Sequence, residues 1–75
     1  MLHPRVNRRI KASEVRVVSE DGTEVGVFSI ADALSLVAGR GLDLVEIGPQ
    51  STPPVCQMID FGLYRYREAK KRRDL

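Results

Sequence analysis

The chain has 75 residues, enough for one small domain that buries only about 60% of the surface of its unfolded chain. The single cysteine, Cys56, excludes an internal disulfide. With only one further candidate, His3, the sequence has neither a metal-ligand set nor the usual Cys/His nucleophile pair. No apolar run approaches the roughly 18 residues of a membrane-spanning helix, and the first residues lack the apolar middle of a secretory signal. We therefore expect a soluble, cytoplasmic chain with no membrane contact and no cofactor.

The net charge of +2 conceals two basic ends around an acidic middle. Residues 12–64 carry two basic and eight acidic side chains, a net charge of −6. Residues 1–11 and 65–75 together carry ten basic side chains against two acidic ones, a net charge of +8. Because salt screens charges over about 8 Å, a polyanion would respond to the local charge of the basic ends and not to the net charge of the whole chain.

Residues 14–28 have the pattern of a β-hairpin. Valines alternate with polar residues or glycine on both sides of Asp21-Gly22. Glycine adopts the positive φ of such a turn without steric cost. The segment therefore predicts two antiparallel strands joined at Asp21-Gly22.

Residues 29–41 change to the spacing of an amphipathic helix. Ser29 is the expected N-cap, and Gly39 and Gly41 are expected to end the helix. The apolar residues on its one face are Ile30, Ala33, Leu34 and Val37.

The remaining chain predicts two more strands and a second helix. Residues 42–48 and 55–62 are strand candidates, and the prolines between them indicate a loop. The order of elements predicts an α+β fold in which one helix covers a four-stranded sheet. If the second and third strands were parallel neighbours, the crossover between them would be right-handed. The segment after Gly62 consists of good helix formers but has no apolar stripe.

The sequence offers little to an enzyme. Glu46 and Asp60 would lie near each other only if the third and fourth strands pair, and a domain this small cannot surround a substrate pocket. The glycines at 39 and 41 fit a helix stop better than a phosphate-binding loop. We therefore expect no catalysis.

Two tyrosines in the basic segment point to a different role. Tyr64 and Tyr66 would lie about 200° apart around a helix, so both cannot pack on the same core. One is expected to anchor the helix, and the other to be exposed between Arg65 and Arg67. Exposed aromatic rings beside arginine are typical of RNA binding, although a helix start followed by a solvated linker explains the pattern equally well.

Three segments of the sequence resemble one family. They are NRRIKASEVRVV from Asn7, DGTEVGVFSIADAL from Asp21 and LDLVEIGPQSTPPVCQMIDFGLYRY from Leu42. Together they are similar to the N-terminal domain of bacterial translation initiation factor 3, over most of the chain. The resemblance implies a β-grasp-like domain with a four-stranded mixed sheet packed by one helix, followed by a basic linker helix.

The resemblance also implies a division of the chain and a set of partners. Residues 1–11 would be a basic leader, 12–62 the globular domain, and 63–75 the start of the linker to a C-terminal domain. That domain would be absent here, either in a cloned fragment or in a shortened relative. The implied partners of this monomer are ribosomal RNA and platform proteins of the small ribosomal subunit, and initiator tRNA. The implied tasks are to select initiator tRNA and the start codon and to prevent premature subunit joining.

Basic and aromatic residues of the leader and linker are the expected RNA contacts. They are Asn7, Arg8, Arg9, Lys11, Tyr64, Arg65, Tyr66, Arg67, Lys70, Lys71, Arg72 and Arg73. The sequence departs from the family at Gln57 and Leu63, where a basic residue is usual, and at Arg67, where an acidic one is common. Phe61 replaces a more frequent tyrosine. The alternative hypothesis is a protein-interaction module that uses the acidic sheet face.

Overall fold

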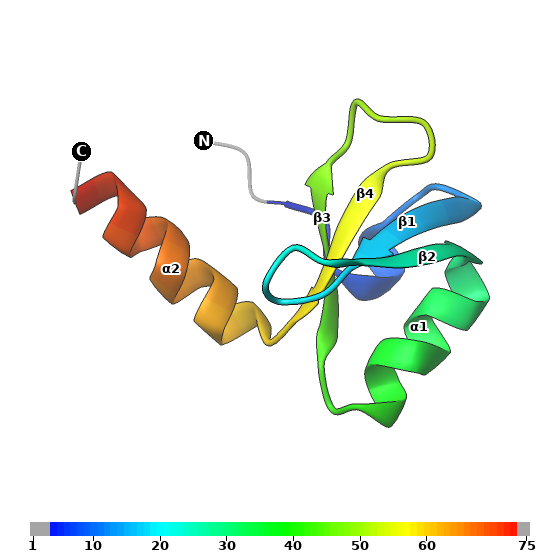
Figure 1. Ribbon diagram of the computed structural model, residues 1–75, viewed down its shortest axis with the longest axis horizontal. Coiled ribbons are helices and arrows are strands. Elements are labelled where there is room, and N and C mark those ends of the chain that lie inside the picture. The colour runs from blue at the N-terminus through cyan, green and yellow to red at the C-terminus, as the bar shows by residue number, and fades with distance from the viewer. Residues whose placement is uncertain (1–3, 74–75) are drawn as a thin grey trace.

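The computed structural model describes residues 4–73, and the side chain of Arg73 lies outside the described part. After a short helix in the leader, its strands and helices follow one another in the predicted order (Figure 1). They are the 3-10 helix η1 (Asn7–Arg9), β1 (Glu14–Val18), β2 (Glu24–Ser29), α1 (Ile30–Gly39), β3 (Asp43–Gly48), β4 (Val55–Ile59) and α2 (Phe61–Arg73). The predicted α+β fold with a four-stranded mixed sheet is confirmed.

The β1–β2 hairpin closes at the predicted turn. Gly22 has a φ of 88°, and its N–H donates to the Ser19 carbonyl at 3.0 Å. Asp21 stabilises the turn because its carboxylate accepts from the Ser19 hydroxyl and, at 3.0 Å, from the Thr23 N–H. These hydrogen bonds, that of Ser19 first, lower the pKa of Asp21 to about 2.

Helix α1 begins and ends at the predicted residues. The Ser29 hydroxyl accepts a hydrogen bond from the Asp32 N–H at 3.1 Å, as an N-cap does. At the other end Gly41 has a φ of 67°, and the Leu42 N–H donates to the Val37 carbonyl at 2.9 Å. This is a Schellman ending, in which a left-handed glycine satisfies carbonyls of the last turn.

The strand order is β2-β1-β4-β3. The parallel neighbours are β1 and β4, with Val17 opposite Cys56, while β3 pairs with β4 in antiparallel fashion. The possibility that β2 and β3 are parallel neighbours is therefore excluded, because these strands are the two edges of the sheet. The tight hairpin keeps β2 beside β1 and leaves the other edge of β1 for β4.

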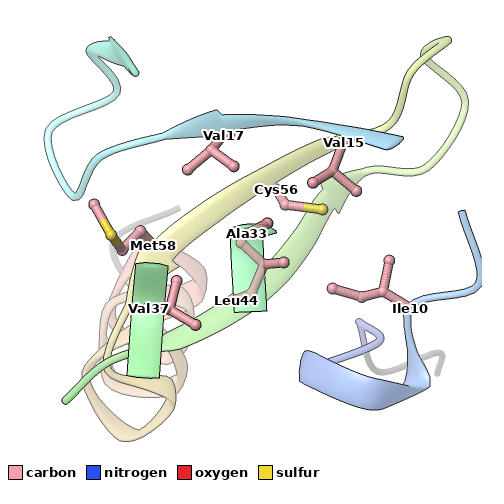
Figure 2. Close-up of a cluster of buried hydrophobic side chains, with 8 residues drawn as sticks. All are labelled: Ile10, Val15, Val17, Ala33, Val37, Leu44, Cys56 and Met58. Atoms are coloured by element: carbon pink, nitrogen blue, oxygen red, sulfur yellow. The ribbon is translucent and has the colours of Figure 1, made fainter. Parts of the chain in front are cut away.

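The core lies between α1 and one face of the sheet (Figure 2). It contains Ile10, Val15, Val17, Ala33, Val37, Leu44, Cys56 and Met58. Ile10 comes from the leader, so the leader contributes a side chain to the core. Burial, together with the nearby Glu46 charge, raises the pKa of the Cys56 thiol to about 11.

Candidate nucleic-acid interface

The leader runs along the outer edge of β3. Val6 forms an antiparallel bridge with Val45, and the Glu46 N–H donates to the Arg5 carbonyl at 2.9 Å. The Arg5 guanidinium lies 4.0 Å from the buried Glu46 carboxylate. The leader is therefore attached to the sheet, and Arg5 offsets part of the cost of burying Glu46.

Asn7 joins the leader to the start of β3. Its φ of 53° is left-handed, a conformation that asparagine tolerates better than most residues. Its side-chain amide donates to Asp43 Oδ1 at 3.0 Å and accepts from the Leu44 N–H at 2.8 Å. Asn7 is a predicted RNA contact, but both ends of its amide are engaged inside the molecule.

Asp43 extends this connection to α2. Its second oxygen, Oδ2, accepts from the N–H of Phe61, the first residue of α2, at 3.0 Å. Asp60 is the N-cap of the same helix, since its Oδ1 accepts from the Leu63 N–H at 2.9 Å. Two carboxylates thus satisfy first-turn donors at the positive end of the helix dipole. We call Asn7, Asp43 and the Phe61 N–H the leader–helix junction.

Aromatic rings of α2 separate into a packed pair and an exposed ring. Phe61 and Tyr64 stack with centroids 6.1 Å apart, and the Arg65 guanidinium lies 5.9 Å from the Phe61 centroid. Tyr64 is half-buried, which raises the pKa of its hydroxyl. Tyr66 is 59% exposed. The prediction that one of the two tyrosines is exposed is confirmed for Tyr66. Tyr64 stacks on Phe61 of the same helix, so its expected role as an anchor of the helix to the sheet stays a prediction.

The predicted basic residues are exposed wherever their side chains are described. Arg8, Arg9 and Lys11 are exposed in the leader, and in α2 so are Arg65, Arg67, Lys70, Lys71 and Arg72. Lys71 forms an ion pair with Glu68 at 3.3 Å. The side chain of Arg73 lies outside the described residues. In Figure 1, α2 extends away from the sheet.

The leader and the start of α2 line one groove. A groove of about 430 Å³ is lined by Pro4, Val6 and Arg9 from the leader and by Phe61 and Arg65 from α2. Of the predicted residues, Arg9 and Arg65 therefore share one surface. Arg67 and Lys70 lie on other sides of α2 by helical spacing.

The structure does not bring Glu46 and Asp60 together. β3 and β4 do pair, with Glu46 opposite Cys56 and Asp43 opposite Ile59, so Glu46 and Asp60 lie toward opposite ends of the pairing. Glu46 is buried beside Arg5, whereas Asp60 caps α2. Within residues 4–73 no group of three or more His, Cys, Asp or Glu could hold a metal ion, and no helix is long and apolar enough to cross a membrane.

Sequence reasoning missed the leader–helix junction and the apolar part of the groove. Asn7 and Asp43 are 36 residues apart, and no local pattern relates them. The replacement at Gln57 also has a role inside the domain, because its amide donates to the Ser19 and Glu20 carbonyls at 3.3 and 3.0 Å.

This arrangement defines a class of protein: a small α+β module whose basic leader and basic helix are linked through Asp43 and line one groove. The family model described as translation initiation factor IF-3, N-terminal domain, matches residues 6–75. The chain belongs to this family, and the resemblance noted in the sequence is confirmed.

Curated relatives carry the name translation initiation factor IF-3. The relative from Neisseria meningitidis is 50% identical over 68 residues, which cover 91% of this chain and 39% of the relative. The relative from Aquifex aeolicus is 47% identical over 70 residues, which cover 93% and 40%. The relative from Myxococcus xanthus is 52% identical over 67 residues, which cover 89% and 27%. The chain thus spans two fifths or less of the length of these relatives.

Proposed function

We propose that this chain is the N-terminal module of a translation initiation factor and binds the small ribosomal subunit in the cytoplasm. In this role it contacts ribosomal RNA and platform proteins, helps select initiator tRNA and the start codon, and helps prevent premature subunit joining. It acts as a monomeric binding module and not as an enzyme. The observation that carries the proposal is family membership, together with the groove that Arg9 of the leader and Arg65 of α2 both line.

The physical basis of the proposal is RNA binding through α2 and the leader. Helix α2 exposes five described basic side chains, and near its start Phe61 and Tyr64 stack on each other. The exposed Tyr66 ring lies between Arg65 and Arg67 in the sequence. Stacking of one base on such a ring contributes about 1 to 3 kcal/mol, while the arginines contact phosphates.

Charge reversal in α2 tests this proposal. Replacement of Arg65, Arg67, Lys70 and Lys71 by Glu should abolish binding of the chain to purified small ribosomal subunits. All four side chains are exposed, so circular dichroism of the sheet domain should stay unchanged. Unchanged affinity in this variant would refute an RNA-binding role for the helix.

A second candidate function is protein binding through the edge strand β2. Val25 and Val27 on this strand are 43% and 47% exposed, and Glu24 lies beside them. Such an edge can pair with a strand of another protein, and the carboxylates of Glu14, Glu20 and Glu24 in the β1–β2 hairpin would attract a basic ribosomal protein. Within the chain, Glu24 forms an ion pair with Arg16 at 2.9 Å. Here charge reversal in α2 should be nearly silent, whereas replacement of Glu14, Glu20 and Glu24 by Lys should weaken binding.

A further inference from the structure

The groove between the leader and α2 combines charge with an apolar floor. Arg9 lines the groove from the leader and Arg65 lines it from α2, while Pro4, Val6 and Phe61 supply apolar surface. None of the described residues that line the groove is acidic. Its volume of about 430 Å³ lies within the range of about 300 to 1,000 Å³ typical of small-ligand sites.

We propose that this groove is a subsite for one nucleotide of single-stranded RNA, in which Arg9 and Arg65 hold the same phosphate. Asn7 and Asp43 act as positioning residues that keep the two arginines on one surface. The inference rests on the proposed function and goes beyond it, because it makes the leader and the helix one binding unit rather than two independent basic segments.

The chemistry of the lining favours a nucleotide. Guanidinium groups bind phosphate oxygens through paired, charge-assisted N–H donors, and two of them match the several acceptor oxygens of one phosphate. The apolar floor suits the ribose and the edge of a base. The Arg65 guanidinium lies over the Phe61 ring, so its outer plane is a further stacking surface for a base.

The leader–helix junction explains how two like charges remain together without a ligand. Arg9 and Arg65 repel each other, so a free leader would move away from the helix. Asn7 opposes this because its side chain is held by Asp43 and by the Leu44 N–H, while Asp43 also holds the Phe61 N–H. Arg9 is two residues from Asn7 in η1, and Arg65 is one turn beyond Phe61 in α2. The junction thus orders the site before a ligand binds, so less conformational entropy is lost on binding and a polyanion binds more tightly.

A double-mutant cycle on the full chain tests whether the two arginines act together. The probe is a fluorescein-labelled decauridylate RNA, titrated by anisotropy at low salt. We expect Arg9→Ala and Arg65→Ala each to weaken binding about tenfold, and the double variant to be no more than about twentyfold weaker, since both groups hold one phosphate. The matched pair Arg8→Ala and Arg67→Ala, which lies outside the groove, should show losses that multiply.

Asn7→Gly tests the positioning role. Glycine keeps the left-handed backbone without the side chain. This substitution should weaken probe binding several-fold in the parent chain and have no further effect in the Arg9→Ala background. A purely structural role would give the same loss in both backgrounds.

The outcomes separate this inference from the proposed function. Independent, multiplying losses for Arg9 and Arg65, or no binding of decauridylate, would overturn the shared subsite even if the chain binds small ribosomal subunits. Coupled losses would support it even if the chain fails to bind subunits, which would instead refute the proposed function.

Discussion

Asp43→Ala should be among the most destabilising substitutions outside the core. The Asp43 carboxylate accepts two hydrogen bonds at 3.0 Å, from the Asn7 amide and from the Phe61 N–H. A hydrogen bond to a charged group contributes about 1.5 to 3 kcal/mol, and a carboxylate at a helix N-terminus adds about 0.3 to 1 kcal/mol. Asp43 is half-buried, so solvent reduces both contributions. We expect the free energy of unfolding to fall by about 2 to 4 kcal/mol.

Urea unfolding followed by far-ultraviolet circular dichroism measures this loss. Asp32→Ala is the matched control, because Asp32 is an exposed carboxylate in the first turn of α1. Its removal should cost no more than about 1 kcal/mol. Asp43→Asn, which keeps one acceptor oxygen, should fall between the two. If Asp43→Ala were no more destabilising than Asp32→Ala, the leader–helix junction would not hold the leader and α2 to the domain.

Two pKa shifts give further predictions. Cys56, with a pKa raised to about 11, should react with a thiol reagent at pH 8 only as fast as the domain opens, and fast reaction with the folded chain would contradict its burial. Because the neutral thiol is favoured in the folded state, its contribution to stability should be complete below about pH 9 and be lost as the pH rises to about 11. Ser19→Ala should return the pKa of Asp21 from about 2 toward 3.8 in an NMR titration, and no change would show that the Ser19 hydroxyl is not its partner. Since the Asp21 pKa is lowered by folding, its contribution is present above about pH 3.8 and is lost as the pH falls to about 2.

Local signals made much of the fold predictable. Three features depend only on residues close to one another in the sequence, so the sequence alone indicates them. They are the Asp21-Gly22 turn, the Ser29 cap and the glycine after α1. The strand order was not predictable in this way. The hairpin shows only that β1 and β2 are neighbours, whereas the β1–β4 pairing joins residues about 39 positions apart, such as Arg16 and Val55.

The candidate site also has some features that local sequence predicts and others that depend on long-range contacts. Exposed arginines and an exposed tyrosine follow from composition and helical spacing, although the packing of Tyr64 on Phe61 was needed to show that Tyr66 is the exposed ring. Asn7 reads as a polar residue in a basic leader, yet its side chain is committed to Asp43 and Leu44. The meeting of Arg9 with Arg65 depends on these long-range contacts, so no local pattern could predict it.

Ribosome binding by this module is tested most directly by titrating the labelled 75-residue chain against purified small ribosomal subunits, with large subunits as the control, over a range of salt concentrations. We expect selective binding to the small subunit that weakens with a log–log salt slope of about −3 to −4, from four to six phosphate contacts at about −0.7 each. Equal affinity for both subunits, or binding that does not respond to salt, would contradict the claim that the basic leader and helix direct this module to ribosomal RNA.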